Sequence, residues 1–342
     1  MKHNVLNKKD YSISAIRLFA IVSIVTCHIL QYMNLELAWW FNVGVQVFLC
    51  ISGWLYGGKR IDDSLSFIKK QFKKILLDYY IVIIPVLILY CFFESEIMSK
   101  SLIFNVLICK QTLPGGGHLW FVATILFCYI LTPMLAKIYD NYDSEKIQNW
   151  FGVTIAILVG YHIIGMAYIP YFEVAKINCF VLGFALRRLQ NKKVREKFCV
   201  YAGLIVLTLF FNGIQIIHTY IKPLPLPLFL VDRWSLFCNY AHTFLGISLF
   251  ILFYEILNNI KFHKIIICFL KVADKYSYNI YLVHQFWILS SATLMEKSPF
   301  LVINIFLIIG ATIISAGIVK LVHEILLYIF DKFSYCIIQI KA

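Results

Sequence analysis

Two ionisable side chains lie inside the first long apolar run of the chain: Arg17 and His28, within residues 12–33. Such residues are costly inside a membrane helix, so where they occur they usually serve a function. Their eleven-residue spacing corresponds to about three helical turns, so both would share one face, about 16 Å apart along the axis. A fixed cation would then lie about half a bilayer from an imidazole able to act as a general base. Alternatively, Arg17 snorkels to lipid headgroups and His28 is structural.

Two later apolar runs also begin or end with polar and aromatic residues. His118 and Trp120 open the run at 118–137, where they could hold a sugar by hydrogen bonding and stacking, or anchor a helix at the membrane interface. Tyr281 and His284 are spaced i, i+3 and therefore share a helix face. No Cys and His group has metal-ligand spacing, so we expect no metal site.

The chain also carries a basic segment at residues 58–74, with two lysine pairs, Lys69–Lys70 and Lys73–Lys74. Lysines bind phosphate as point charges, so this segment could hold the phosphates of a nucleotide-bearing donor. The alternative is that the segment follows the positive-inside rule and contacts anionic lipid.

Composition identifies the elements that would position these residues. The 342 residues are 61% hydrophobic and 14% charged, and the mean hydropathy is +0.79, which favours a polytopic membrane protein over soluble domains. A net charge of +13 can indicate nucleic acid binding, but here the basic residues lie in short loops between apolar runs. The first run is too long for a signal-peptide core and lacks a small-residue cleavage site, so we expect a retained helix.

We predict an all-α polytopic fold, a single membrane-embedded domain over residues 1–342 with about ten transmembrane helices. The predicted spans are at about residues 12–33, 40–57, 75–93, 118–137, 150–169, 172–188, 199–217, 236–258, 276–294 and 300–329. Of the 31 Lys and Arg residues, 23 lie in the inner segments and helix ends of an N-in, C-in topology and 5 in the outer segments. This topology places Arg17 toward the cytoplasm and His28 in the outer half, below a belt formed by Tyr32, Trp39 and Trp40.

The segment at 94–117 contains a short apolar run, 101–109, which is too short to span a bilayer and is either interfacial or re-entrant. It ends in Leu113-Pro114-Gly115-Gly116-Gly117, which we expect to be a flexible hinge. Glycine and serine near the end of the second span, including Ser52 and Gly53, usually permit close helix packing.

These features together resemble the family-3 membrane acyltransferases, which are bacterial integral-membrane O-acetyltransferases of surface sugars. The resemblance covers nearly the whole chain. It rests on the Arg-x10-His pattern of Arg17 and His28, the Phe-x3-Ser-Gly end of the second span at Phe48, Ser52 and Gly53, the basic segment followed by Tyr79, the His-Leu-Trp-Phe run at His118, and the Ser-Tyr-x-Ile-Tyr-Leu-x-His run at 277–284.

The resemblance implies acetyl-CoA or another acyl-CoA as cytoplasmic donor and the hydroxyl of a cell-surface glycan or lipid-linked saccharide as acceptor. It implies transfer within the bacterial inner or plasma membrane, with His28 as catalytic base and Arg17 at the donor site. An extended phosphopantetheine arm is about as long as the separation of these two residues. We assign donor binding to Arg17, Lys69, Lys70, Lys73, Lys74 and Ser52, and acceptor binding to His118, Trp120, Tyr281 and His284.

The chain departs from the family pattern in two places. Where the family often has Arg-x-x-Arg followed by Pro, the matching positions are Gln71, Lys74 and Leu77, and Gln46 stands where many members have an acidic residue. Some members carry an additional extracytoplasmic hydrolase-like domain that passes the acyl group onward; we expect direct transfer to the acceptor here.

Two other classes of function remain open from the sequence. A glycan or glycolipid transporter could line its path with Arg17 and His28, although the paired broken helices of many transporters are not evident. A membrane sensor or scaffold could use the polar residues to fix helix packing. Capsule, lipopolysaccharide, teichoic acid, poly-N-acetylglucosamine, enterobacterial common antigen and a non-sugar compound are all open as acceptors, and succinyl is an alternative acyl group.

Overall fold

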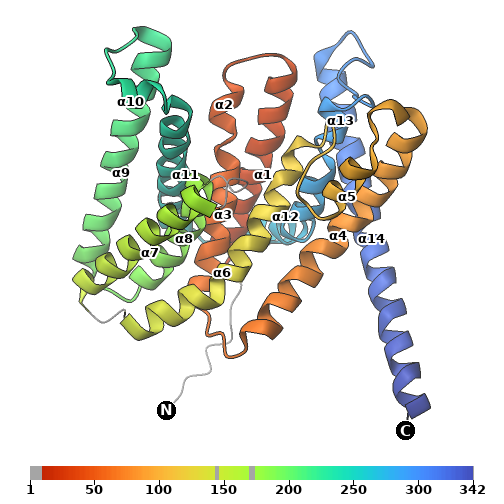
Figure 1. Ribbon diagram of the computed structural model, residues 1–342, viewed down its shortest axis with the longest axis horizontal. Coiled ribbons are helices and arrows are strands. Elements are labelled where there is room, and N and C mark those ends of the chain that lie inside the picture. The colour runs from red at the N-terminus through yellow and green to blue at the C-terminus, as the bar shows by residue number, and fades with distance from the viewer. Residues whose placement is uncertain (1–9, 143–145, 169–173, 342) are drawn as a thin grey trace. The chain divides into compact units, whose positions relative to one another are not determined.

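The computed structural model describes residues 10–142, 146–168 and 174–341, and every regular element in this part of the chain is a helix (Figure 1). The predicted all-α fold class is therefore confirmed. The chain forms two compact units, each built from two separate stretches of sequence. Unit 1 comprises Met1–Asp62 and Ile130–Asp274, and unit 2 comprises Asp63–Tyr129 and Lys275–Ala342. The single domain over 1–342 stays a prediction.

The helices of each unit follow in chain order. Unit 1 contains α1 (Tyr11–Tyr32), α2 (Ala38–Phe41), α3 (Val43–Gly57), α7 (Ile147–Tyr168), α8 (Val174–Leu189), α9 (Val194–Ile216), η3 (Ile217–Ile221), α10 (Leu228–Val231) and α11 (Trp234–Asn258). Unit 2 contains α4 (Ser64–Phe93), η1 (Ser95–Ile97), α5 (Lys100–Leu107), η2 (Gly117–Leu119), α13 (Phe286–Leu289) and α14 (Leu301–Lys341). The boundary between the units falls inside α6 (Trp120–Tyr142) and α12 (Lys264–Val283).

Seven helical segments among the described residues are long and apolar enough to cross a membrane. They are Tyr11–Tyr32, Ala38–Gly57, Ser64–Phe93, Gly117–Tyr142, Val194–Ile221, Trp234–Asn258 and Leu301–Phe330. The other three predicted spans correspond to α7, α8 and α12: α8 has only 16 residues, and α12 contains Lys271, Asp274 and Lys275. The chain is thus a multi-pass membrane protein, while the count of ten spans and the N-in, C-in orientation stay predictions.

The prediction of one continuous span at 276–294 is wrong. Helix α12 ends at Val283, and α13 follows as a separate four-residue helix. After α13, the Ser290 hydroxyl donates to the Phe286 carbonyl at 2.5 Å and the Thr293 hydroxyl to the Ile288 carbonyl at 2.8 Å. Such side-chain bonds to nearby backbone compete with helix formation. Hydropathy alone does not report this competition.

Helix α5 packs against α4, the helix that precedes it (Figure 1). The Tyr79 and Tyr80 hydroxyls of α4 donate to the carbonyls of Val106 and Leu107, at 2.6 and 3.1 Å. Tyr79 lies fourteen residues before the end of α4 at Phe93, which is about 21 Å along the helix axis. The hydrogen bonds therefore place the end of α5 beside the middle of α4, and both interpretations, interfacial and re-entrant, stay predictions.

The expected flexible hinge at Leu113–Gly117 is instead a packed turn. Leu113 is 2% exposed, the Gly116 N–H donates to the Leu113 carbonyl at 2.9 Å, and the Tyr90 hydroxyl donates to the Pro114 carbonyl at 2.8 Å. Gly115 has a φ of +67°, and a Cβ there would lie 2.5 Å from Ser290 Cα. Glycine is used here for a left-handed conformation and close backbone contact, which leaves the turn little freedom to move.

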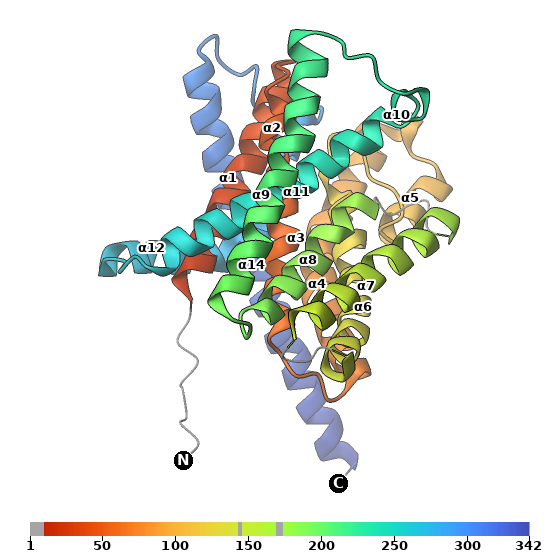
Figure 2. The ribbon, with the colours of Figure 1, turned by 90° about the vertical axis from the view of Figure 1, so that its left-hand side faces the viewer.

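In unit 1, α3 and α8 lie side by side (Figure 2). A Cβ at Gly53 would lie 1.9 Å from the Phe180 carbonyl oxygen, and a Cβ at Gly183 would lie 2.2 Å from the Cys50 carbonyl oxygen. The reciprocal contact confirms that small residues near the end of the second predicted span permit close helix packing.

We expect Gly53→Ala to destabilise the protein by about 1–3 kcal/mol, because the added methyl group would force the α3 and α8 backbones apart. Thermal unfolding in nanodiscs measures the effect. Gly203→Ala is the matched control, since a Cβ at Gly203 meets nothing within 4 Å. Equal midpoints for the two variants would contradict the α3–α8 contact.

Candidate functional site

Arg17 and His28 lie on one unbroken helix. Asp10 caps α1, its carboxylate accepting the Ser12 N–H at 2.9 Å, and the helix continues to Tyr32. Both residues therefore lie on one side of α1, three turns apart. Helix α1 packs closely on α3, since a Cβ at Gly44 would lie 2.4 Å from the Ala20 carbonyl oxygen.

The imidazole of His28 is oriented by its own helix. His28 Nδ1 lies 3.0 Å from the side-chain oxygen of Gln31. Because an amide oxygen only accepts hydrogen bonds, the proton of the neutral ring is on Nδ1 and its lone pair is on Nε2. His28 is half-buried. In the neutral ring this hydrogen bond leaves Nε2 as the basic atom.

Arg17 is partly buried and pairs with a carboxylate from the other end of the chain. Arg17 Nη1 donates to Asp274 Oδ1 of α12, and the two side chains are 22% and 14% exposed. Asp274 follows Arg17 by 257 residues, and no sequence spacing relates them. The sequence analysis therefore missed this partner. A guanidinium has five N–H donors in a planar fork, a geometry that suits carboxylates and phosphates.

Trp39 and Trp40 pack on a buried histidine of unit 1. The Trp39 ring stacks on the His242 ring at 4.4 Å and the Trp40 ring meets it edge-on at 5.9 Å, while His242 is 0% exposed. One turn further along α11, a Cβ at Gly246 would lie 2.4 Å from Gln46 Cβ. Gln46 is also 0% exposed. A neutral amide suits this position, because a carboxylate there would be costly without a partner.

The lysine pairs lie on the first turns of α4, which begins earlier than predicted. Asp63 caps the helix by accepting the N–H groups of Leu65 and Ser66 at 3.0 and 3.1 Å. The lysines share one exposed side of the helix, at positions 69, 70, 73 and 74. The opposite side, with Gln71 and Asp78, is buried. In unit 1, Ser52 is half-buried on α3, next to the contact that Gly53 makes with α8.

In unit 2 the structure brings His118, Tyr281 and His284 together. His118 is 4% exposed, and its ring centroid lies 5.2 Å from that of Tyr281 and 4.9 Å from that of His284. The Tyr281 hydroxyl donates to the His118 carbonyl, and the His118 N–H donates to Gln285 Oε1 at 2.7 Å. Trp120 is half-buried, with its ring 6.2 Å from the Phe121 ring.

Backbone carbonyls define the tautomers of both histidines in this cluster. His118 Nε2 lies 3.1 Å from the Leu282 carbonyl oxygen, and His284 Nδ1 lies 2.7 Å from the Tyr281 carbonyl oxygen. Since a carbonyl only accepts, these nitrogens carry the protons of the neutral rings. The sequence analysis missed Gln285, although this residue directly follows the 277–284 run and is only 5% exposed.

A second polar group in unit 2 links α4 and α14. Asp78 Oδ1 lies 2.5 Å from His323 Nδ1, and the two residues are 7% and 9% exposed. Nearby, Lys275 Nζ lies 3.3 Å from Glu324 Oε1, where both side chains are half exposed. The sequence shows these residues as isolated polar positions, and only the fold pairs them. Among the described residues, no group of three or more His, Cys, Asp and Glu could hold a metal ion.

The described residues form helices, and seven helical segments among them are of membrane-spanning length, with histidines and an arginine inside them. These features define a multi-pass membrane protein with intramembrane polar residues. The family model described as an acyltransferase domain, that of the family-3 acyltransferases, matches residues 10–320. The chain therefore belongs to the family-3 acyltransferases, which confirms the resemblance found in the sequence. Neither the curated proteins nor the solved structures contain a match.

Proposed function

We propose that the protein is an O-acyltransferase that moves an acyl group, most simply acetyl, from cytoplasmic acyl-CoA to a hydroxyl of a cell-envelope glycan or glycolipid. The observation that carries this proposal is the family match, which includes α1 with Arg17 and His28 on one face. The proposed setting is a bacterial inner or plasma membrane, with both termini in the cytoplasm.

The proposed reaction is a direct transfer. The acceptor hydroxyl oxygen attacks the thioester carbonyl carbon while His28 Nε2 takes the hydroxyl proton. The tetrahedral intermediate then expels the coenzyme A thiolate, which receives a proton, and the ester product remains. Gln31 supports this step by holding the His28 proton on Nδ1.

Arg17 and the exposed lysine side of α4 are the proposed donor-binding groups, because both present fixed positive charge that suits phosphates. Ser52 is a further proposed donor contact. The proposed acceptor-binding residues are His118, Trp120, Tyr281 and His284; three of them form the ring cluster of unit 2. A buried cluster of rings and fixed imidazoles can both stack with a sugar and hydrogen-bond its hydroxyls.

The decisive test is acyl-CoA binding by the purified protein in nanodiscs, measured by calorimetry with acetyl-CoA, succinyl-CoA and palmitoyl-CoA. We expect binding of at least one donor in the micromolar range, equivalent to about −8 kcal/mol. A well-folded sample that binds none of them would overturn the acyltransferase proposal and favour a glycan or glycolipid transporter.

Gln31→Leu is expected to lower the acyl-transfer rate about tenfold, the effect of losing one orienting hydrogen bond to His28. The acceptor KM should change little, because Gln31 acts through the imidazole. Gln31→Glu is the matched control, since a carboxylate still accepts from Nδ1 and should retain the rate. An unchanged rate in Gln31→Leu would show that this hydrogen bond does not matter for transfer.

A further inference from the structure

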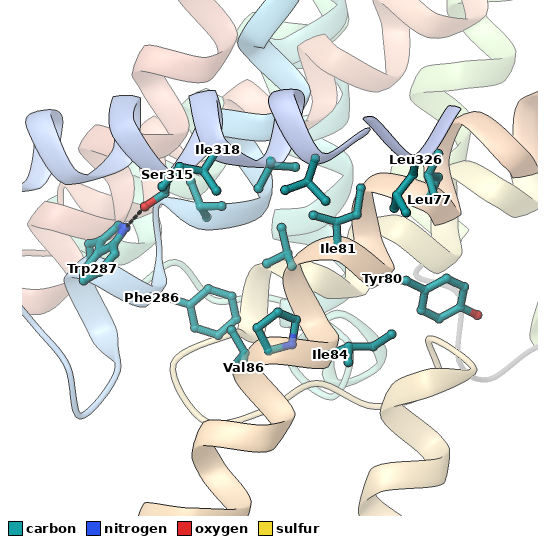
Figure 3. Close-up of a pocket in the computed structure, with 15 residues that line it drawn as sticks. Leu77, Tyr80, Ile81, Ile84, Val86, Phe286, Trp287, Ser315, Ile318 and Leu326 are labelled. Atoms are coloured by element: carbon teal, nitrogen blue, oxygen red, sulfur yellow. Dashed lines mark hydrogen bonds between the residues drawn. The ribbon is translucent and has the colours of Figure 1, made fainter. Parts of the chain in front are cut away.

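Unit 2 contains an apolar groove between α4 and α14, with a volume of about 560 Å³ (Figure 3). Its walls include Tyr80 and Ile84 of α4 and Ile318 and Val319 of α14. Along α4 it extends from Leu77 to Val86, which is about 14 Å of helix. Ile84 and Ile318 are 45% and 56% exposed, so the groove is open at its side. Both helices are of membrane-spanning length, and an apolar groove between such helices suits a hydrocarbon chain.

Polar contacts hold the groove at both ends. At one end, beside Leu77, Asp78 of α4 binds His323 of α14 at 2.5 Å. At the other end the Trp287 indole N–H donates to the Ser315 hydroxyl of α14 at 3.1 Å, as Figure 3 shows. Both contacts tie α14 to the opposite wall of the groove. The polar groups of its lining side chains are the Ser315 hydroxyl, the Trp287 indole N–H and the Tyr80 hydroxyl. The remaining lining side chains are apolar, so the groove suits hydrocarbon.

The groove adjoins the ring cluster of His118. Consecutive residues face the two sites: Val283 and Phe286 line the groove, whereas His284 and Gln285 contact His118. The Phe286 ring itself lies 5.8 Å from the His118 ring. One short segment therefore separates a hydrocarbon site from a cluster of polar rings, which matches a ligand with an apolar chain and a polar head.

We propose that this groove binds the hydrocarbon chain of the acceptor, and that the acceptor is a glycolipid with its saccharide at the His118 cluster. The choice of a glycolipid rests on the proposed function, whereas the chain site rests on the groove alone. The adjoining His118 cluster would have no role in binding an ordinary phospholipid, because such a lipid carries no saccharide. The acyl chain of an acyl-CoA could also occupy such a groove, and competition with palmitoyl-CoA distinguishes this donor from the acceptor.

The experiment uses photo-crosslinking of the full chain in nanodiscs. The probe is glucose linked to a single hexadecyl chain that carries a diazirine at its middle, and peptide mass spectrometry locates the crosslinks. We expect them on residues 77–86 of α4 and 315–326 of α14. Excess hexadecyl glucoside should remove them, and excess phosphatidylglycerol should not.

Two variants test whether the groove itself holds the probe. Ile318→Trp and Ile84→Trp fill it from opposite walls and should each lower crosslinking at least about tenfold, because several methylene groups lose their contacts. The matched control is Ile314→Trp, on a residue of α14 that is 65% exposed and outside the groove. Thermal unfolding shows whether each variant is folded. Because the two variants change opposite walls, one of them still gives the test if the other does not fold.

Several outcomes would overturn the proposal. If crosslinks were spread over the outer faces of α4 and α14, and phosphatidylglycerol removed them equally well, the probe would only be part of the surrounding lipid. Removal by palmitoyl-CoA but not by hexadecyl glucoside would assign the groove to the donor. Acyl transfer to methyl glucoside with the same KM as to hexadecyl glucoside would overturn the glycolipid assignment while the proposed acyltransferase function stands. Loss of all acyl-CoA binding with crosslinks intact would instead overturn the proposed function.

Discussion

His28→Ala is expected to lower acyl transfer by about 100- to 10,000-fold, the usual effect of removing a general base. Acetyl-CoA binding should survive, because the imidazole takes a proton from the acceptor and does not hold the donor phosphates. His28 Nδ1 lies 3.0 Å from the side-chain oxygen of Gln31, so in the neutral ring Nε2 is the atom that could take the proton. Transfer of radiolabelled acetyl from acetyl-CoA and calorimetry on the same preparation measure the two effects separately.

His162→Ala is the matched control for this prediction. His162 is also a half-buried helical histidine of unit 1, with Nδ1 bound to the Leu158 carbonyl and its ring stacked on Tyr240 at 5.5 Å. It should retain both activity and binding. If His28→Ala kept the wild-type rate, His28 would be a structural residue. If it lost donor binding together with transfer, the separation of donor site and base would be wrong.

The parts of the candidate sites that lie on one helix could be predicted from the sequence. Arg17 and His28, and likewise Tyr281 and His284, are related by helical periodicity, which sequence spacing reports directly. The contact of His118 with α12 joins residues more than 160 positions apart, and the Arg17–Asp274 pair joins still more distant ones. Such contacts depend on how helices pack, and a single sequence contains no periodic signal for them.

The boundaries of the helices also depend on contacts that hydropathy does not report. Hydropathy located apolar runs, but α4 begins at Ser64 because Asp63 caps it, well inside the segment expected to be a basic loop. The end of α13 at Leu289 coincides with the Ser290 and Thr293 hydroxyls, which bond to backbone carbonyls. The glycine run before His118 suggested flexibility, whereas its contact with Ser290 packs it in place. In each case a specific polar or steric contact decided the local structure.

Arg17→Ala is expected to weaken acetyl-CoA binding by about 10- to 100-fold, the effect of losing a charge-assisted hydrogen bond to a phosphate. Calorimetry on the variant in nanodiscs measures it. Arg188→Ala is the matched control, because Arg188 is also a partly buried arginine of unit 1 and pairs with Asp140 at 2.6 Å. It should leave the acetyl-CoA affinity unchanged.

The ion pair with Asp274 makes a purely structural role for Arg17 the strongest competing explanation. Removing Arg17 alone leaves the 14% exposed Asp274 carboxylate without this partner, which destabilises the protein whether or not Arg17 binds the donor. The double variant Arg17→Ala with Asp274→Ala removes both charges and should recover much of the thermal stability. If the affinity stays low in the double variant, the guanidinium contacts the donor. If the affinity returns with stability, Arg17 serves only to hold α1 and α12 together, and the donor-site assignment is wrong.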